Sequence, residues 1–355
     1  MRLEVRPILV RVGFSVLVVL PWILLSTTQV SSKSEDRWYK GNLHTHTINS
    51  DGDSSPDVVA RWYKENRYNF LVLSDHNYLT DPKGLNSIFA AEEQSSCLWC
   101  PSFLLISGEE VTSGFEEKPV HVNAFNLHHT LQPMFGKSVL DTIQKNVDAI
   151  REVGGIPSLN HPNFRWAITP TELSQVRNLR LFEIFNGTPR THDFGGGGTP
   201  GLEEMWDIVL SAGNRAYGRA VDDAHEFKVF GPEYGNPGRG WVNVKARELS
   251  VEAILESLER GHFYSSTGVV LTNVEWFSDG LQIDIVPATT KWLHTSNNKD
   301  DRKYTVDFIG KDGELLERSF DNNSSYTLRP GQLYVRAKVT SSDGEMAWVQ
   351  PVFAH

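Results

Sequence analysis

Six of the twelve histidines in this sequence stand in short motifs or close to carboxylates, and this is the set best suited to chemistry. The motifs are His44-Thr45-His46, Ser50-Asp51-Gly52, Ser74-Asp75-His76, Glu109-Glu110, His121, Asn160-His161-Pro162 and Asp222-Asp223-Ala224-His225. Mixed imidazole and carboxylate ligands suit zinc, manganese or iron better than magnesium alone. Six histidines with three or four carboxylates exceed one tetrahedral site, so the set predicts two or three divalent ions.

The position of these motifs along the chain predicts that they meet. His44 and His46 are two residues apart, so on an extended chain their side chains point to one face. Four further motifs follow apolar runs at 70–73, 103–107, 156–159 and 216–221. Active sites of parallel α/β proteins lie at the carboxyl ends of strands. A single histidine is most often an ordinary surface or core residue, but agreement among five strand ends favours one shared site. His121 lies inside an apolar run, and its spacing does not place it.

The elements that would position these motifs alternate between strand and helix. Short apolar runs predict strands, and amphipathic segments between them predict helices, over 56–66, 85–93, 138–153, 202–212 and 250–260. This alternation from Gly41 to Gly268 predicts a mostly parallel sheet in an α/β domain spanning 40–268. From Val269 the helical pattern stops. Two hairpin patterns with Asp-Gly turns, around Asp312 and Asp343, predict a small antiparallel β-domain over 269–355.

The N-terminus resembles an export signal. Arg2, Arg6 and Arg11 precede the apolar stretch 12–25, and small polar residues follow up to Ser32. This is the three-part layout of a secretory signal peptide over residues 1–32. The uncharged stretch 12–32 also approaches the roughly 20 residues that span a bilayer, so an uncleaved membrane anchor is the alternative. Either case predicts an exported protein, periplasmic or secreted.

The only cysteines, Cys97 and Cys100, form a C-x-x-C pair. No further metal-binding residues flank the pair as a zinc site would require, and no helix is predicted to begin at it as in thioredoxin-type motifs. We expect a structural disulfide or two free thiols.

Taken in order, these motifs resemble those of the polymerase and histidinol phosphatase (PHP) family, over about 41–268. The chain most resembles the exported branch related to carbaryl hydrolase, whose members also carry a C-terminal β-domain. The resemblance implies a distorted (β/α)7 barrel followed by a β-sandwich-like domain. It also implies up to three metal ions. One would be held by His44, His46, Glu110 and Asp223, a second by Glu110, His121 and His161, and a third by Asp51, His76 and His225.

The predicted chemistry is hydrolysis by hydroxide formed from metal-bound water, because a bound divalent ion lowers the pKa of water towards neutrality. Asp223, Glu110 and His161 are the candidate catalytic residues that would carry a proton. Arg165, Arg190 and Arg219 are candidate clamps for an anionic substrate, although each is as readily an ordinary surface arginine.

A phosphomonoester or phosphodiester is the first choice of substrate, and a carbamate or carboxylic ester is the alternative. A non-catalytic, metal-stabilised binding module is a further alternative, which the size of the ligand set disfavours. The formal net charge of −10 argues against binding to duplex DNA, so we expect a small-molecule ester and no nucleic-acid partner. Contact with a membrane is expected only through an N-terminal anchor, and the sequence does not indicate an oligomeric state.

Overall fold

The computed structural model describes Met1 and residues 36–96, 102–286 and 302–354. The predicted signal peptide and the pair Cys97 and Cys100 lie outside the described residues. No helix in the described part of the chain is long and apolar enough to cross a membrane.

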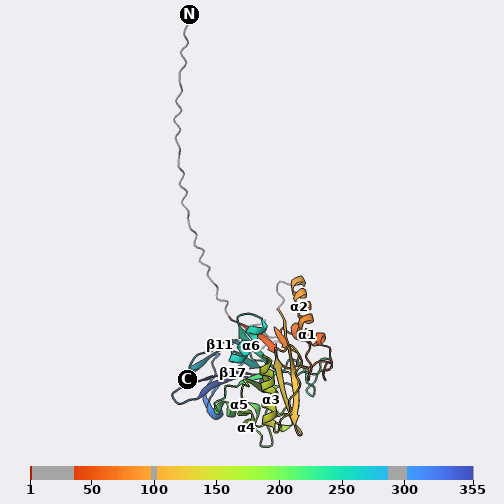
Figure 1. Cartoon of the computed structure of the whole chain (residues 1–355). Coiled ribbons are helices and arrows are strands. Elements are labelled where there is room, and N and C mark those ends of the chain that lie inside the picture. The colour runs from red at the N-terminus through yellow and green to blue at the C-terminus, as the bar shows by residue number, and fades with distance from the viewer. Residues whose placement is uncertain (2–35, 97–101, 287–301, 355) are drawn as a thin grey trace. The chain divides into compact units, whose positions relative to one another are not determined.

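The region from 36 to 268 alternates strands and helices, as predicted (Figure 1). Its strands are β1 (Arg37–Asn42), β2 (Phe70–Val72), β3 (Leu104–Ile106), β4 (Gly108–Phe115), β5 (Lys118–Phe125), β6 (Ile156–Leu159), β7 (Leu181–Asn186), β8 (Tyr217–Val221), β9 (Trp241–Ala246) and β10 (Phe263–Ser266). Its helices are α1 (Pro56–Glu65), α2 (Lys83–Ser96), α3 (Val139–Glu152), α4 (Pro170–Leu173), α5 (Leu202–Ser211) and α6 (Val251–Arg260), with a single 3-10 turn, η1 (Phe164–Trp166).

The chain beyond 268 is built from strands. They are β11 (Leu271–Trp276), β12 (Gly280–Ile285), β13 (Tyr304–Ile309), β14 (Leu315–Ser319), β15 (Asn323–Thr327), β16 (Tyr334–Ser341) and β17 (Met346–Phe353), with a 3-10 turn, η2 (Lys311–Gly313). Both predicted hairpins are confirmed, because β13 pairs with β14 and β16 pairs with β17.

Three sheets organise these strands. The largest has the order β14-β13-β16-β17-β10-β9-β1-β2-β3, the second has the order β4-β5-β6-β7-β8, and the third has the order β11-β12-β15. Isolated parallel bridges, Thr45 to Ala224 and His76 to Glu110, connect the first two sheets where the candidate metal ligands lie. The fold is therefore mixed α/β, and the closed seven-stranded barrel stays a prediction.

One expectation about the sheet was too simple. Strands β1, β2 and β3 run parallel to one another, as do β6, β7 and β8, but β9 is antiparallel to both β1 and β10. Strand β5 is likewise antiparallel to both β4 and β6. The reason is local: β3 continues into β4, and a tight turn at Glu116 and Glu117 sends the chain straight back as β5. Glu110 thus lies within a strand rather than after one.

The predicted helices are confirmed, and their boundaries follow from capping groups. Ser138 and Ser250 accept hydrogen bonds from backbone N–H groups three residues later, at the starts of α3 and α6. Helix α6 ends at Gly261, whose φ of +75° is a conformation that glycine adopts without strain.

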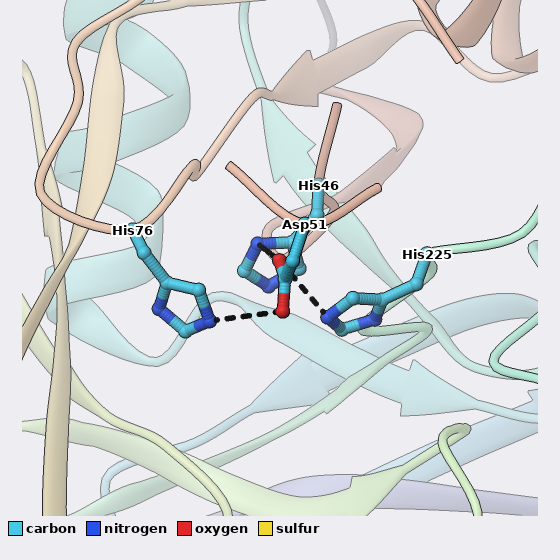
Figure 2. A group of neighbouring side chains, drawn as sticks. All are labelled: His46, Asp51, His76 and His225. Atoms are coloured by element: carbon cyan, nitrogen blue, oxygen red, sulfur yellow. Dashed lines mark ion pairs between the residues drawn. The ribbon is translucent and has the colours of Figure 1, made fainter. Parts of the chain in front are cut away.

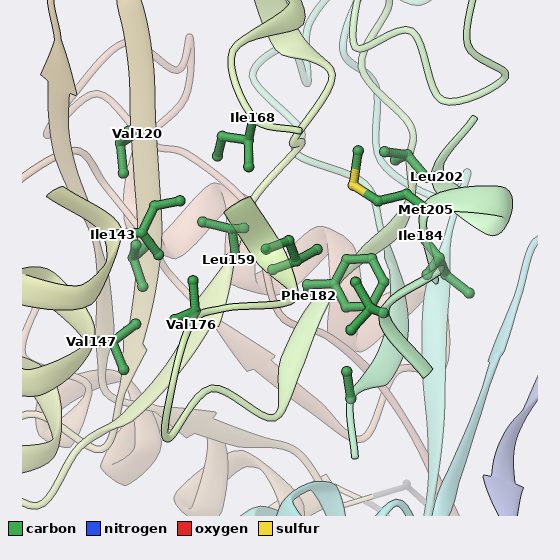
Figure 3. Close-up of a cluster of buried hydrophobic side chains, with 14 of the residues drawn as sticks. Val120, Ile143, Val147, Leu159, Ile168, Val176, Phe182, Ile184, Leu202 and Met205 are labelled. Carbon is green, nitrogen blue, oxygen red and sulfur yellow. The ribbon is translucent and has the colours of Figure 1, made fainter. Parts of the chain in front are cut away.

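The main core packs the second sheet against α3 and α5. Val120, Leu159 and Phe182 from the strands meet Ile143 and Met205 from the helices, all of them buried (Figure 3). Burial of such side chains, each worth about 1.5–3 kcal/mol, fixes the strands whose ends carry the candidate ligands.

A second cluster joins the two sheets of the C-terminal region. Ile283 of β12 shares one core with Val306 of β13 and Val339 of β16, which is the arrangement expected of a β-sandwich-like unit. Strand β17 also pairs with β10, so the C-terminal strands extend the sheet that contains β1. The division of the chain at residue 269 stays a prediction.

Candidate metal centre

The structure brings all nine predicted metal ligands together from several strands. Among the described residues, four groups have donor atoms lying within 4.8 Å of one another. These are His46, Asp51, His76 and His225; His44, Glu110 and His161; His44, His46 and Asp223; and His76, Glu110 and His121.

Figure 2 shows the first group, with Asp51 between the imidazoles of His76 and His225. The carboxylate of Asp51 stands among three imidazoles, 3.5 Å from His46 Nδ1, 3.6 Å from His76 Nε2 and 3.5 Å from His225 Nε2. The side chain of Asp51 is 54% exposed, so this group faces solvent. The group consists of the three residues of the predicted third site, Asp51, His76 and His225, with His46 added.

The three inner groups are connected by shared ligands. Glu110 belongs to two of them, with Oε1 lying 3.1 Å from His121 Nδ1 and 3.3 Å from His161 Nε2. Asp223 Oδ1 lies 3.1 Å from Nε2 of both His44 and His46. Both histidines of the predicted second site therefore lie beside the same oxygen of Glu110, and the assignment of this site stays a prediction.

Hydrogen bonds at the far ring nitrogen orient two of the histidines. His44 donates from Nδ1 to Glu183 Oε1 at 2.7 Å, and His225 donates from Nδ1 to the backbone oxygen of Asp223 at 2.8 Å. In both residues Nε2 remains for a metal ion. A carboxylate or carbonyl at the second nitrogen is the usual way in which proteins fix the tautomer of a ligating histidine.

Glu183 is a functional residue that the sequence analysis missed. It is fully buried in β7, and besides His44 its carboxylate accepts hydrogen bonds from the backbone N–H of His161 at 2.7 Å and from Asn186 Nδ2 at 2.8 Å. Asn186 Nδ2 also donates to Asp223 Oδ2 at 3.0 Å. One buried carboxylate thereby connects three candidate ligands.

A sequence signal for Glu183 does exist. It is a charged residue inside the apolar run Leu181-Phe182-Glu183-Ile184-Phe185, and charged side chains are almost never fully buried unless they are paired. Its partner is Arg219, directly opposite on β8, with NH2 lying 3.1 Å from Glu183 Oε1.

This pairing corrects the proposed role of Arg219. The side chain is fully buried and also donates hydrogen bonds to Ser158 and Asn160, so it cannot contact a substrate as a clamp. Arg165 is exposed beside Phe164, which lines the metal pocket. Arg190 lines a neighbouring pocket. Both remain candidate substrate contacts.

Two further residues position the ligands. Asp75 is fully buried and accepts hydrogen bonds from the backbone N–H of Thr47 at 2.7 Å and from Ser50 Oγ at 2.8 Å. It thereby holds the turn between His46 and Asp51. Asn160 donates from Nδ2 to Glu110 Oε1 at 2.7 Å.

The charges at the centre are arranged to hold cations. Burial raises the pKa of Glu110, but the neighbouring histidines outweigh it and hold that pKa well below its ordinary value. Burial lowers the pKa of His76, but Glu110 and Asp51 outweigh it and raise that pKa to about 10. Burial and the charge of His225 lower the pKa of His46 to about 4. The ionised carboxylates therefore place negative charge at the centre, and protons on some of the histidines partly neutralise it.

Divalent ions fit this donor set. Glu110 Oε2 is buried 2.8 Å from His76 Nδ1, and it has no hydrogen-bond partner in the part of the chain that the structure describes. A buried carboxylate oxygen without a hydrogen bond is costly. A metal ion coordinated by Glu110 and His76 would satisfy it, and metal binding would release the protons that the histidines carry.

The sequence matches no known protein-family profile and no functionally curated protein. The structure is similar to several solved structures, each at 16% identity or less. One is a two-domain protein from Bacteroides vulgatus that contains a predicted PHP-like metal-dependent phosphoesterase, with a TM-score of 0.47 and 16% identity, covering 89% of this chain and 87% of that one. Another, described as a candidate metal-dependent phosphoesterase, is from Bifidobacterium adolescentis, with a TM-score of 0.38 and 14% identity, covering 57% and 91%.

A third similar structure is an amidohydrolase from Chromobacterium violaceum with bound sulfate and no metal, with a TM-score of 0.36 and 14% identity, covering 53% of this chain and 88% of that one. Membership of the branch related to carbaryl hydrolase stays a prediction.

Proposed function

We propose that this protein is a metal-dependent phosphoesterase that hydrolyses phosphomonoesters or phosphodiesters. The observation that carries the proposal is the convergence of nine imidazole and carboxylate side chains into four overlapping groups of ligand atoms, each within 4.8 Å. A structural metal site needs only about four ligands and is closed. A larger set that borders an open pocket favours catalysis over a purely structural role.

Charge favours a phosphoester over a carboxylic or carbamic ester. The nine residues include three carboxylates, Asp51, Glu110 and Asp223, so two divalent ions would leave one net positive charge and three ions would leave three. Glu183 and Arg219 neutralise each other beneath the site. A surplus of positive charge in a partly buried pocket attracts an anionic ester more strongly than a neutral one.

The residues of the chain would share the work as follows. Bound divalent ions would supply Lewis-acid activation of water and of the ester. Glu110, Asp223 and His44 would hold such ions, with His44 oriented by Glu183. His161, whose Nε2 lies at the pocket wall 3.3 Å from Glu110, would carry a proton during the reaction. Phe164 would shield one side of the pocket from water.

The test combines metal analysis with activity. Purified protein is analysed for its metal content, stripped with a chelator and reloaded with manganese or zinc. Hydrolysis of p-nitrophenyl phosphate, its bis ester and an aryl carbamate is then measured in parallel. We expect phosphoester hydrolysis that is lost on chelation and restored by metal.

A histidine pair supplies a matched control. His44→Ala removes a fully buried candidate ligand, whereas His129→Ala changes an exposed histidine outside the four groups. We expect loss of metal and activity in the first variant only. Full phosphoesterase activity in metal-free protein, or hydrolysis of the carbamate alone, would contradict the proposal.

Export and the choice of partners rest on the sequence. We propose an exported enzyme that acts on a small-molecule ester, with residues 1–32 as signal peptide or anchor. Determining the N-terminal residue of the protein from its native host distinguishes cleavage from anchoring, and recovery of the unprocessed chain in the cytosol would contradict export.

A further inference from the structure

The metal pocket is smaller than a typical ligand pocket. Its volume is about 180 Å³ and its walls are mainly the candidate metal ligands. At ~30 Å³ per water molecule this is room for about six waters, which metal ions and one phosphate-sized group would fill. Typical ligand pockets measure roughly 300–1,000 Å³. The alcohol part of a substrate would therefore extend into the space beside the pocket.

A second cavity of about 460 Å³ adjoins the metal pocket, and the two share Thr188 and His225 in their walls. Gly235 forms part of its lining, where the backbone N–H of His225 donates to the Gly235 carbonyl at 2.8 Å. A Cβ atom on Gly235 would lie 2.7 Å from Thr188 Oγ1. Glycine at this position therefore avoids a clash with Thr188, which lines both cavities. Another cavity, lined by Leu79, Lys83 and His128 among others, shares no residue with the metal pocket.

The lining of the second cavity mixes charges of both signs. Arg190 and Glu233 are exposed, and Tyr234 and Glu226 are partly exposed. Glu226 is held in place because its Oε2 accepts a hydrogen bond from the Gly235 N–H at 2.7 Å. Arg190 has a φ of +80°, a strained conformation for a residue with a side chain, and such strain is concentrated at ligand-binding and active sites.

This combination selects a chemical class. A second anionic group would meet Glu226 and Glu233, and a cationic group would meet Arg190. An alkyl chain would displace water from Arg190 and Glu233 without replacing its hydrogen bonds. Hydroxyl groups both donate and accept hydrogen bonds, so they can serve the carboxylates and the guanidinium at once.

We propose that the second cavity binds an uncharged, hydroxyl-bearing alcohol group, so that the preferred substrates are monophosphates of sugars or other polyols. This inference rests on the proposed phosphoesterase function. Arg190, Glu233 and Tyr234 are the residues that would recognise the hydroxyl groups.

The test uses three primary alkyl phosphates whose leaving groups are of similar reactivity. Metal-loaded protein is assayed with glucose 6-phosphate, n-hexyl phosphate and fructose 1,6-bisphosphate, and with p-nitrophenyl phosphate as a general reporter of phosphoesterase activity. We expect kcat/KM for glucose 6-phosphate to exceed that for each of the other two alkyl esters by about tenfold, the effect of roughly one charge-assisted hydrogen bond.

Variants of the cavity supply the second measurement. Glu233→Gln and Arg190→Gln should each raise KM for glucose 6-phosphate by about three- to tenfold and lower its preference over n-hexyl phosphate. Glu317→Gln, which changes an exposed glutamate on β14, should leave that preference unchanged. Saturation-transfer NMR should show contact between the protein and the ring protons of glucose 6-phosphonate, weakened in both cavity variants.

The outcomes separate the two proposals. Absence of hydrolysis of every ester, p-nitrophenyl phosphate included, would overturn the proposed function and this inference with it. Hydrolysis of p-nitrophenyl phosphate with equal or better use of n-hexyl phosphate or the bisphosphate would overturn the inference alone. A preference for glucose 6-phosphate that neither Glu233→Gln nor Arg190→Gln reduces would also overturn it.

Discussion

Replacing Glu183 by glutamine tests whether the buried network beneath the centre positions the metal ligands. The substitution keeps the shape of the side chain and removes its charge. Arg219 then loses its nearest carboxylate, which lies 3.1 Å away in a region where both side chains are fully buried. His44 loses the ionised acceptor of its 2.7 Å hydrogen bond.

Two magnitudes follow. Breaking a buried ion pair by removing one partner costs about 3–5 kcal/mol, so we expect Glu183→Gln to lower the free energy of unfolding by this amount. Loss of the acceptor that orients a ligating histidine lowers metal affinity by about 10–100-fold. The first effect is measured by urea unfolding of metal-free protein, and the second by calorimetric titration of folded protein with manganese or zinc.

A double variant separates the two effects. Combining Glu183→Gln with Arg219→Met also removes the buried guanidinium charge that Glu183→Gln alone leaves unpaired. The free energy of unfolding of the double variant should therefore be about 1–3 kcal/mol higher than the sum of the two single changes predicts. Its metal affinity should stay low because His44 still lacks its carboxylate partner. Additive stability changes, or wild-type metal affinity in Glu183→Gln, would refute the reasoning.

Three further predictions concern stability. Asp207→Ala should lower the free energy of unfolding, measured in urea, by about 3–5 kcal/mol, because it leaves the buried charge of Arg336 without its carboxylate partner. The Nε and NH2 atoms of Arg336 lie 2.7 and 2.6 Å from that carboxylate, and a loss below about 1 kcal/mol would contradict the prediction. Burial raises the pKa of Asp193 from 3.8 to about 7, so the folded state holds a proton that the unfolded chain releases, and stability should fall as pH rises across this window. Asp193→Asn should flatten that slope in urea titrations, and an unchanged slope would argue against it. If the concentration of free metal is about a hundred times its Kd, chelation should lower the free energy of unfolding of the metal-loaded protein by about 2.7 kcal/mol. An unchanged melting temperature would show that no ion was bound.

The Asp207 contact also bears on how the C-terminal strands relate to the rest of the chain. Asp207 lies on α5, whereas Arg336 and Tyr334 lie on β16, and the tyrosine hydroxyl donates to Asp207 at 3.0 Å. This buried polar network attaches the C-terminal strands to the rest of the chain at a second place, in addition to the pairing of β17 with β10. We therefore expect removal of the C-terminal strands to destabilise the part of the chain that carries the metal centre.

The sequence by itself determined the elements and the inventory of ligands. Alternating apolar and amphipathic segments predicted the helices and hairpins because those patterns are local. Most of the ligand motifs follow apolar runs, and side chains at the carboxyl ends of neighbouring strands converge whatever the detailed register. All nine predicted ligands lie together, although Glu110 and His121 lie within strands.

Tertiary structure decided which ligands are neighbours and what lies beneath and beside them. Strand β5 is antiparallel to β4, which places His121 beside Glu110, and the register of β7 on β8 sets Glu183 against Arg219. Arg219 looked like a candidate clamp because its sequence neighbourhood does not reveal that every residue of β8 is buried. Register, burial and shared cavity walls depend on contacts between residues distant in the chain, and no local pattern encodes them.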